Sequence, residues 1–160
     1  MINYSKNFLN KNDFDILKNV ILGYNFPWYF SEKTYEKDND FQFVHLFYNE
    51  NEIKSNYFYL IEPILIKLNC KKILRIKANL TTKQKSSYVF GFHNDVNEDC
   101  ITSIFYLNSN NGKTVFEKNI SYKSEENCMI SFPSNLKHSG TTHTDEKIRV
   151  VLNLNFMSEE

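Results

Sequence analysis

Apolar and polar residues alternate along most of the chain after residue 70. Alternation with a period of two is typical of a β-strand with one buried face. Polar residues, glycine or proline separate the alternating stretches and indicate turns. The predicted strands lie at 72–80, 87–94, 100–107, 113–117, 127–132 and 147–156. Many short strands with regular turns favour a sandwich or a barrel, and a jelly roll is one such fold.

The turn between the third and fourth of these strands contains an Asn-Gly pair. Asn111 and Gly112 lie in the segment NSNNGK, at 108–113. Asn-Gly is favoured in tight hairpin turns because both residues tolerate positive φ angles. We therefore predict a hairpin at this turn.

The first 70 residues show a mixed pattern. Asn12 or Asp13 could cap a short helix that carries five apolar residues and ends at Gly23. Two aromatic segments, at 26–30 and 41–48, are strand-like. This part of the chain therefore predicts a combination of helix and strand.

A second helical pattern precedes the all-β region. Apolar residues recur at helical spacing in 56–69, where Pro63 either kinks the helix or marks its true start. The predicted fold class is therefore mainly β with N-terminal helices. We expect a single domain, 1–160, in which 1–70 forms helices and flanking strands and 71–160 forms a jelly-roll core.

Length and composition are those of one folded domain. The chain has 160 residues, of which 41% are hydrophobic and 16% aromatic, so it can bury a core and is too apolar for a disordered chain. Lys plus Arg and Asp plus Glu are both 19. This balance leaves no overall basic field to attract nucleic acid or an acidic membrane surface. We therefore expect a small molecule or a peptide as the partner.

The cysteines and the N-terminus indicate a reducing compartment. Cys70, Cys100 and Cys128 are odd in number and widely spaced, which is typical of reduced thiols rather than of disulfides or a zinc site. The N-terminal residues lack a continuous apolar stretch, so no signal peptide is apparent. No apolar segment approaches the ~20 residues that span a bilayer. We expect a cytoplasmic protein.

Two candidate metal ligands stand two positions apart in the segment FGFHNDV. The side chains of His93 and Asp95 point to the same side if this segment is extended. A third ligand must then come from a distant strand, and His138, at the end of ISFPSNLKH, is the best candidate. Two histidines and one carboxylate form the facial triad of non-haem iron(II) oxygenases, which leaves coordination positions open.

A rare arginine lies on the last predicted strand. Arg75 and Arg149 are the only arginines among the 19 basic residues, so an arginine carries more information here than a lysine. In KIRVVLNLNF, Ile148 begins an apolar face, and Arg149 begins a polar face that includes Asn153. The polar face could lie in water or could line a polar pocket. In a pocket, the planar guanidinium of Arg149 would suit a buried carboxylate.

The remaining histidines and Arg75 leave alternatives open. His143 competes with His138 for the third ligand position, although the pattern places His143 in a connecting loop. His45 is interpreted as a packed or surface strand residue, with a place in the substrate cleft as the alternative. Arg75 is interpreted as an exposed strand cation, with a pocket role as the alternative. His93 by itself could belong to a surface pair with its neighbouring carboxylate.

The four strongest site residues form a pattern that resembles a known superfamily. H-x-D at His93 and Asp95, a distal His138 and then Arg149 are similar to the pattern of the 2-oxoglutarate and iron(II)-dependent oxygenases. The segment TSIFYLNSNNGKTVFE resembles the core strand and hairpin of their prolyl-hydroxylase-like branch. The stretch 74–156 resembles small stand-alone members encoded by bacteriophages, and the first 70 residues resemble them only loosely.

The resemblance implies a fold and residue roles. The implied fold is a double-stranded β-helix, which is a jelly roll, with helices packed on one side. The implied metal ligands are His93, Asp95 and His138, and the implied co-substrate residues are Arg149, Tyr106, Asn79 and Asn153. Relatives often carry a Gly-Gly pair in the hairpin where this chain has Asn-Gly. We expect this difference to affect turn geometry and not chemistry.

The implied activity is that of a hydroxylase that uses iron(II), 2-oxoglutarate and O2, with ascorbate as an optional reductant. The prolyl-hydroxylase-like resemblance slightly favours a peptide or protein side chain as the substrate, and a phage-encoded member would act in the host cytoplasm. One alternative is a cupin-like metal enzyme without 2-oxoglutarate, which would not need the carboxylate clamp of Arg149 and Tyr106. The other is a non-enzymatic jelly-roll binding or virion module, which predicts no metal affinity.

Overall fold

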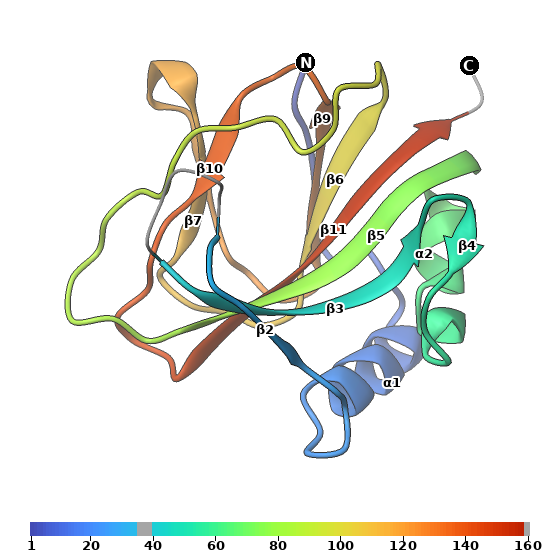
Figure 1. The fold of residues 1–160 in the computed structure, drawn as a ribbon, viewed down its shortest axis with the longest axis horizontal. Helices are drawn as coiled ribbons and strands as arrows, with labels where there is room; N and C mark the ends of the chain where they lie inside the picture. The colour runs from blue at the N-terminus through green and yellow to red at the C-terminus, as the bar shows by residue number, and fades with distance from the viewer. Residues whose placement is uncertain (35–39, 159–160) are drawn as a thin grey trace.

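Antiparallel strands are the main regular elements of the computed structural model, which describes residues 1–34 and 40–158 (Figure 1). Eight strands form the larger sheet: β1 (Asn3–Ser5), β2 (Tyr29–Ser31), β3 (Gln42–Asn49), β4 (Glu52–Ile53), β5 (Cys70–Thr82), β6 (Ile101–Tyr106), β9 (Cys128–Pro133) and β11 (Ile148–Ser158). Their order is β1-β9-β6-β11-β5-β3-β2, with β4 beside β3. The smaller sheet contains β7 (Lys113–Phe116), β8 (Ser121–Lys123) and β10 (His138–Gly140), with β7 in the centre.

Two α-helices lie against one face of the larger sheet (Figure 1). The helical segments are α1 (Lys11–Ile21), α2 (Glu62–Lys67) and the 3-10 turns η1 (Phe58–Leu60) and η2 (Glu117–Asn119). Pro63 lies in the first turn of α2. Backbone N–H groups in the first turn have no acceptor within the helix, so the N–H that proline lacks is not needed there. This position confirms that Pro63 marks a helix start and not a kink. None of the described helices is long and apolar enough to cross a membrane.

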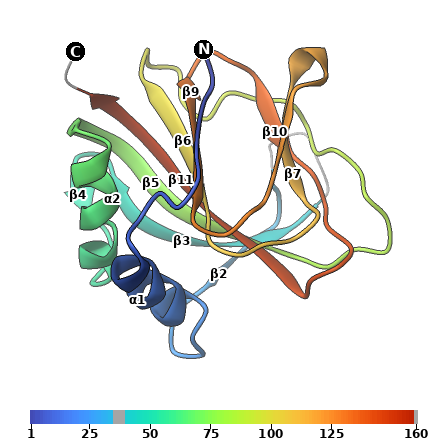
Figure 2. The ribbon, with the colours of Figure 1, turned by 180° about the vertical axis from the view of Figure 1, so that it is seen from behind.

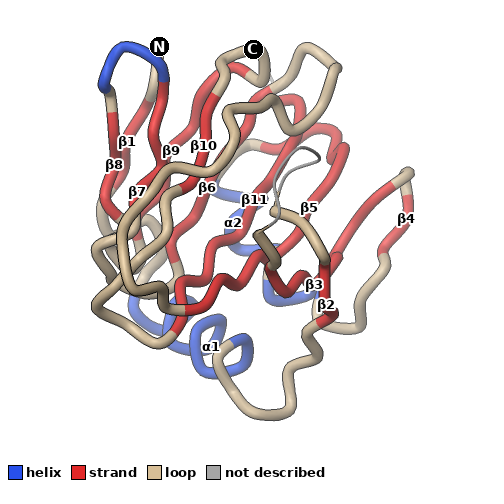
Figure 3. The backbone as a smooth tube through the Cα atoms, turned by 60° about the vertical axis from the view of Figure 1, so that its left-hand side comes forward, coloured by secondary structure: helices blue, strands red, loops and turns tan. Residues whose placement is uncertain are grey.

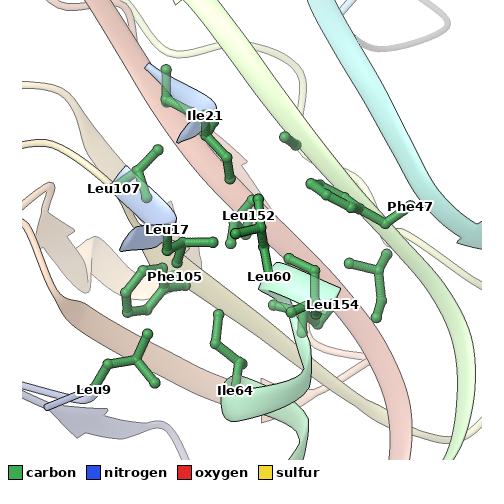
Figure 4. Packing of buried hydrophobic residues seen from close by; sticks show 14 of the residues in the cluster. Leu9, Leu17, Ile21, Phe47, Leu60, Ile64, Phe105, Leu107, Leu152 and Leu154 are labelled. Carbon is green, nitrogen blue, oxygen red and sulfur yellow. The ribbon is translucent and has the colours of Figure 1, made fainter. Parts of the chain in front are cut away.

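The hydrophobic core lies between the helices and the larger sheet (Figure 4). Helix α1 contributes its buried face, Phe14, Leu17 and Ile21. The central strand β11 contributes its apolar face, Val150, Leu152, Leu154 and Phe156. Packing this face against the helices turns the other face of β11, which carries Arg149 and Asn153, away from the core. The alternation in the last strand therefore decides which side of the sheet is polar.

The opposite face of the larger sheet looks toward the smaller sheet (Figures 1 and 3). The N-terminal strand β1 pairs with β9 at the edge of the larger sheet (Figure 2). It runs beside β8 of the smaller sheet (Figure 3), and the ring centroids of Tyr4 and Tyr122 are 5.4 Å apart. The space between the sheets contains a cavity lined by both, for example by Asn79 of β5 and Thr114 of β7. A site on this part of the polar face therefore lies between the two sheets.

The predicted hairpin at Asn111 and Gly112 is wrong. Strand β6 pairs with β9 and β11, whereas β7 pairs with β8 and β10. The turn therefore carries the chain from one sheet to the other. Neither turn residue has a positive φ angle, so the backbone freedom that makes Asn-Gly a hairpin signal is not used.

Two further predictions are corrected locally. Asn10 caps α1, and not Asn12 or Asp13, because the Asn10 side chain accepts a hydrogen bond from the backbone N–H of Asp13 at 2.9 Å. The predicted strand at 87–94 forms only isolated bridges, of which one joins His93 to His138. The segment is thus extended at the point where the candidate ligands lie.

Candidate metal centre and adjoining cavities

His93 and His138 lie directly opposite each other on neighbouring extended segments. The backbone N–H of His93 donates to the carbonyl of His138 at 3.0 Å, and the N–H of His138 donates to the carbonyl of His93 at 3.1 Å. This exchange is the hydrogen-bonded pair of an antiparallel ladder, which brings the two Cα atoms to about 5.5 Å. The two ring centroids are 5.0 Å apart. A single backbone bridge therefore brings together two histidines that are distant in sequence.

Asp95 places its carboxylate beside both imidazole rings. Its Oδ1 lies 3.7 Å from Nε2 of His93, and its Oδ2 lies 3.4 Å from Nε2 of His138. One donor atom from each residue lies within 4.8 Å of the other two. The side chains of Asp95 and His138 are each only 4% exposed. The structure thus brings together the three residues that the sequence predicted as ligands.

Backbone carbonyls orient the two imidazoles. Nδ1 of His93 lies 2.9 Å from the carbonyl oxygen of Gly91, and Nδ1 of His138 lies 3.4 Å from that of Leu136. A carbonyl oxygen can only accept a hydrogen bond, so each Nδ1 carries a proton, and Nε2, which faces Asp95, is the ring nitrogen available to a metal. Metal-binding histidines characteristically donate the second ring nitrogen in this way.

The electrostatics of the cluster favour an ionised carboxylate. Burial by itself would raise the pKa of Asp95, but the hydrogen bonds from His138 and His93 and the charge of Arg75 hold that pKa well below its usual value. Burial opposes the charging of His93, yet its interactions with Asp95 and with the Gly91 carbonyl raise the pKa of His93. Two imidazoles and one carboxylate are the donor set of iron(II) oxygenases, so the residues present fit that metal.

Arg149 lies at the opposite end of a narrow cavity from these ligands. The cavity holds about 80 Å³, and its lining includes His93, Asp95, His138 and Arg149. Arg149 is only 6% exposed, and its Nε donates to the hydroxyl of Ser124 at 2.9 Å. No carboxylate among residues 1–34 and 40–158 forms an ion pair with it, and burial lowers its pKa. A buried guanidinium without a counter-ion is costly, so this end of the cavity suits an anion.

A tyrosine and a threonine flank the guanidinium. The hydroxyl of Tyr106 donates to Oγ1 of Thr114 at 2.9 Å, and burial raises the pKa of Tyr106 to about 12. Tyr106 is therefore neutral at physiological pH. Thr114 lines the cavity, whereas Tyr106 lies behind it. Sequence reasoning missed Thr114.

The two predicted asparagines lie on adjacent strands in this cavity. Asn79 of β5 lies opposite Val151 of β11, and Asn153 of β11 lies opposite Lys77 of β5. Asn153 donates through Nδ2 to Oδ2 of Asp95 at 2.9 Å, so it orients the carboxylate. The Oδ1 atoms of Asn79 and Asn153 have no hydrogen-bond partner in the described part of the chain. The polar face of β11 thus lines a pocket and is not in water.

The other candidate residues lie outside the ligand cluster or at its edge. His143 is fully buried in its loop and is not in the cluster that His138 completes. His45 is packed, with Nδ1 2.8 Å from the carbonyl of Pro27 and Nε2 2.7 Å from the hydroxyl of Ser55. Arg75 is not an exposed strand cation, because its Nη2 lies 3.3 Å from Oδ1 of Asp95. Arg75 therefore lies at a pocket, as its alternative interpretation predicted.

Gly112 allows Arg149 to pass close to the chain. A Cβ atom at Gly112 would lie 2.7 Å from Cδ and 3.0 Å from Nε of Arg149, and 2.8 Å from Oδ1 of Asn110. These distances are shorter than van der Waals contact. The glycine of the Asn-Gly turn is therefore required for the close approach of Arg149.

No family model matches the chain, and no curated protein sequence does. Solved structures resemble it along almost its whole length. A viral collagen prolyl hydroxylase from Paramecium bursaria Chlorella virus-1, in complex with 2-oxoglutarate, is 15% identical with a TM-score of 0.64, and the match covers 99% of this chain and 96% of that one.

Two further structures extend the similarity beyond the prolyl hydroxylases. An oxidoreductase of the 2-oxoglutarate-Fe(II) oxygenase family from Burkholderia pseudomallei is 11% identical with a TM-score of 0.66, over 99% of this chain and 86% of that one. The non-haem α-ketoglutarate-dependent epimerase SnoN from nogalamycin biosynthesis is 8% identical with a TM-score of 0.71, over 98% and 77%. The chain therefore has the jelly-roll fold of the 2-oxoglutarate- and iron(II)-dependent oxygenases.

Proposed function

We propose that this chain is an iron(II)- and 2-oxoglutarate-dependent oxygenase. His93, Asp95 and His138 would hold the metal, and Arg149 would hold the distal carboxylate of 2-oxoglutarate. The observation that carries the proposal is the combination of a three-donor cluster at one end of a cavity with a buried, unpaired guanidinium at the other. A metal enzyme that does not use 2-oxoglutarate has no need for such a guanidinium.

The polar side chains in and beside the inner cavity have distinct tasks in this proposal. The planar fork of Arg149 would bind both oxygens of the distal carboxylate, and the neutral pair of Tyr106 and Thr114 would supply a hydroxyl beside it. Asn153 would keep Asp95 oriented toward the metal through its 2.9 Å hydrogen bond. Asn79 would contribute its unsatisfied Oδ1 next to the co-substrate. The sheets on both sides would exclude water from the reacting groups.

Hydroxylation is the reaction type that we propose. When bound, iron(II) and 2-oxoglutarate would supply oxidation of the substrate by O2, with succinate and carbon dioxide as co-products. Several structural neighbours are prolyl hydroxylases, including one from Pseudomonas putida and one from Trichoplax adhaerens in complex with a peptide. These neighbours favour a peptide or protein side chain as the substrate.

An anaerobic spectroscopic titration tests the proposed function. Iron(II) is added to the protein, followed by 2-oxoglutarate, and a visible metal-to-ligand charge-transfer band should appear only after the second addition. His138→Ala should abolish the band, whereas His143→Gln should retain it because His143 lies outside the donor cluster. A wild-type protein that develops no band would refute the proposed function.

Substitution of Gly112 should weaken co-substrate binding through Arg149. In Gly112→Ala, the new methyl group would force Cδ of Arg149 away from its present position at 2.7 Å. We expect the affinity for 2-oxoglutarate to fall by about 10-fold or more, measured as the midpoint of the band titration. The neighbouring, exposed Lys113 offers a control, and Lys113→Ala should leave the midpoint unchanged. An unchanged midpoint in Gly112→Ala would show that Arg149 does not set it.

A further inference from the structure

A second, wider cavity opens next to the metal-ligand cluster. It holds about 730 Å³, and its lining includes His93, Asp95 and several residues that do not line the narrow inner cavity. Its cationic lining residues are Lys33, Arg75, Lys77 and Lys137. Asp95 is the one carboxylate among the described residues of this lining. Among the described lining residues of this outer cavity, four cations therefore face one carboxylate, in a protein whose net charge is zero.

Lys77 is the basic residue, among those described, that lines both cavities. Arg149 lines only the inner cavity and Arg75 only the outer one. No residue in the described part of the chain accepts a hydrogen bond from the Lys77 ammonium or forms an ion pair with it. Burial and the neighbouring charge of Arg75 lower the pKa of Lys77, and the charge of Asp95 opposes this only in part. A half-buried, unpartnered ammonium at this place costs stability, which indicates a role in binding.

Arg75 extends the same cationic surface outward. It stands two residues before Lys77 on β5, so both side chains point to the cavity face of the strand. Its Nη2 lies 3.3 Å from Oδ1 of Asp95, but Nε and Nη2 make no hydrogen bond within residues 1–34 and 40–158. Asp95 is at the same time shared with His138 and Asn153. The single negative charge of Asp95 cannot neutralise both Arg75 and Lys77 and also offset the charge of a divalent metal ion.

Bound 2-oxoglutarate would not supply the missing negative charge, because its metal-side carboxylate and Asp95 would together offset the two charges of the metal ion. Thr81 lies opposite Arg149, and Lys77 is four residues farther along β5, which is ~13 Å along the strand. Arg149 would already take the distal carboxylate of 2-oxoglutarate at the inner end. Arg75 lies another two residues outward and does not reach the inner cavity. The unmatched positive charge therefore faces the space that a substrate would enter.

We propose that Lys77 and Arg75 form a binding site for an anionic group, a carboxylate or a phosphate, of the primary substrate. This inference rests on the proposed function, because it takes the outer cavity as the substrate side of the metal. It narrows the substrate class to molecules or peptides that carry a negative charge near the carbon that reacts. A planar guanidinium beside an ammonium is suited to two or more anionic oxygens.

Thermal unfolding of an inert complex tests the anion site without turnover. The protein is loaded with zinc(II) and 2-oxoglutarate, which fills the inner cavity, and is then titrated with inorganic phosphate or with acetate at constant ionic strength set by chloride. We expect at least one of the two anions to raise the unfolding midpoint by about 3–6 °C at ten times its dissociation constant. The two titrations distinguish a phosphate site from a carboxylate site.

Variants assign the effect to the two cations. Lys77→Met and Arg75→Met should each remove the anion-dependent shift, and Lys72→Met provides a matched control because Lys72 is exposed on the same strand. Lys77→Arg should retain the shift, which separates loss of charge from loss of folding. The proposal is overturned if neither anion shifts the wild-type midpoint, if Lys77→Met responds like the wild type, or if the shift occurs only without 2-oxoglutarate.

The two hypotheses fail in different ways. A normal charge-transfer band with iron(II) and 2-oxoglutarate, combined with no anion shift, rejects the anion site and leaves the proposed function standing. A missing band, combined with a shift that depends on Lys77, rejects the oxygenase function and leaves an anion-binding cavity. The band and the unfolding midpoint therefore report on the two claims separately.

Discussion

Replacing Asp95 by alanine should lower the affinity of the protein for iron(II) or zinc(II) by at least about 100-fold, which is the upper end of the effect of residues that only orient a ligand. Asp95 is the one anionic donor of the cluster and lies within 3.7 Å of both imidazole Nε2 atoms. Without it, two neutral imidazoles beside the positive charge of Arg75 would have to bind a divalent cation. Competition with a chromophoric chelator measures the dissociation constant directly.

Two comparisons separate charge from shape in this experiment. Asp95→Asn preserves the size of the side chain but removes its negative charge, and it should lose most of the metal affinity as well. Asp99→Ala removes an exposed acid four residues farther along the chain, outside the cluster, and should bind metal like the wild type. If Asp95→Ala retained an affinity within a few-fold of the wild type, the cluster would not be the metal site.

The sequence could reveal the candidate metal ligands because their arrangement depends on local geometry. His93 and Asp95 are two residues apart, and any extended segment points such a pair to one side. The segment forms no named strand, yet its single bridge to His138 is enough to hold the geometry. The choice of His138 over His143 also agrees with the structure, because a residue on a paired segment is fixed more rigidly than one in a loop.

The environment of a polar strand face could not be read from the sequence. Arg75, Lys77 and Asn79 alternate with apolar residues on β5 in the same manner as Arg149 and Asn153 on β11. Alternation shows that one face is polar, but only the position of the second sheet decides whether that face meets water or a cavity. The sequence pattern therefore favours an exposed Arg75 and does not distinguish Lys77 from other strand lysines.

The Asn-Gly turn shows a different limit of sequence reasoning. Its residues carry a strong hairpin signal, but the turn joins two sheets because β6 has partners on both sides, β9 and β11. Strand pairing is a long-range property, and a local preference does not determine it. The physical requirement for Gly112 comes from Arg149, which is distant in sequence and reaches it only in the folded chain.

Arg149→Met should reduce the affinity for 2-oxoglutarate by about 100-fold, which corresponds to the loss of two charge-assisted hydrogen bonds. Methionine approximates the length and volume of the aliphatic part of arginine, so the loss should concern the carboxylate contact more than packing. The metal ligands lie at the other end of the cavity, and metal affinity should therefore be unchanged. The charge-transfer titration and the chelator competition measure the two affinities independently.

The specificity of the co-substrate site gives a sharper form of the same prediction. The wild-type protein should bind 2-oxoglutarate much more tightly than 2-oxopentanoate, which has the same five-carbon chain without the distal carboxylate, because only the former compensates the buried guanidinium. In Arg149→Met this preference should disappear, while Arg149→Lys should retain part of it as a single point charge that cannot form the planar fork. A wild-type protein that binds both acids equally would show that the guanidinium does not recognise the distal carboxylate, and the assignment of the inner cavity to 2-oxoglutarate would then fail even if the metal site is real.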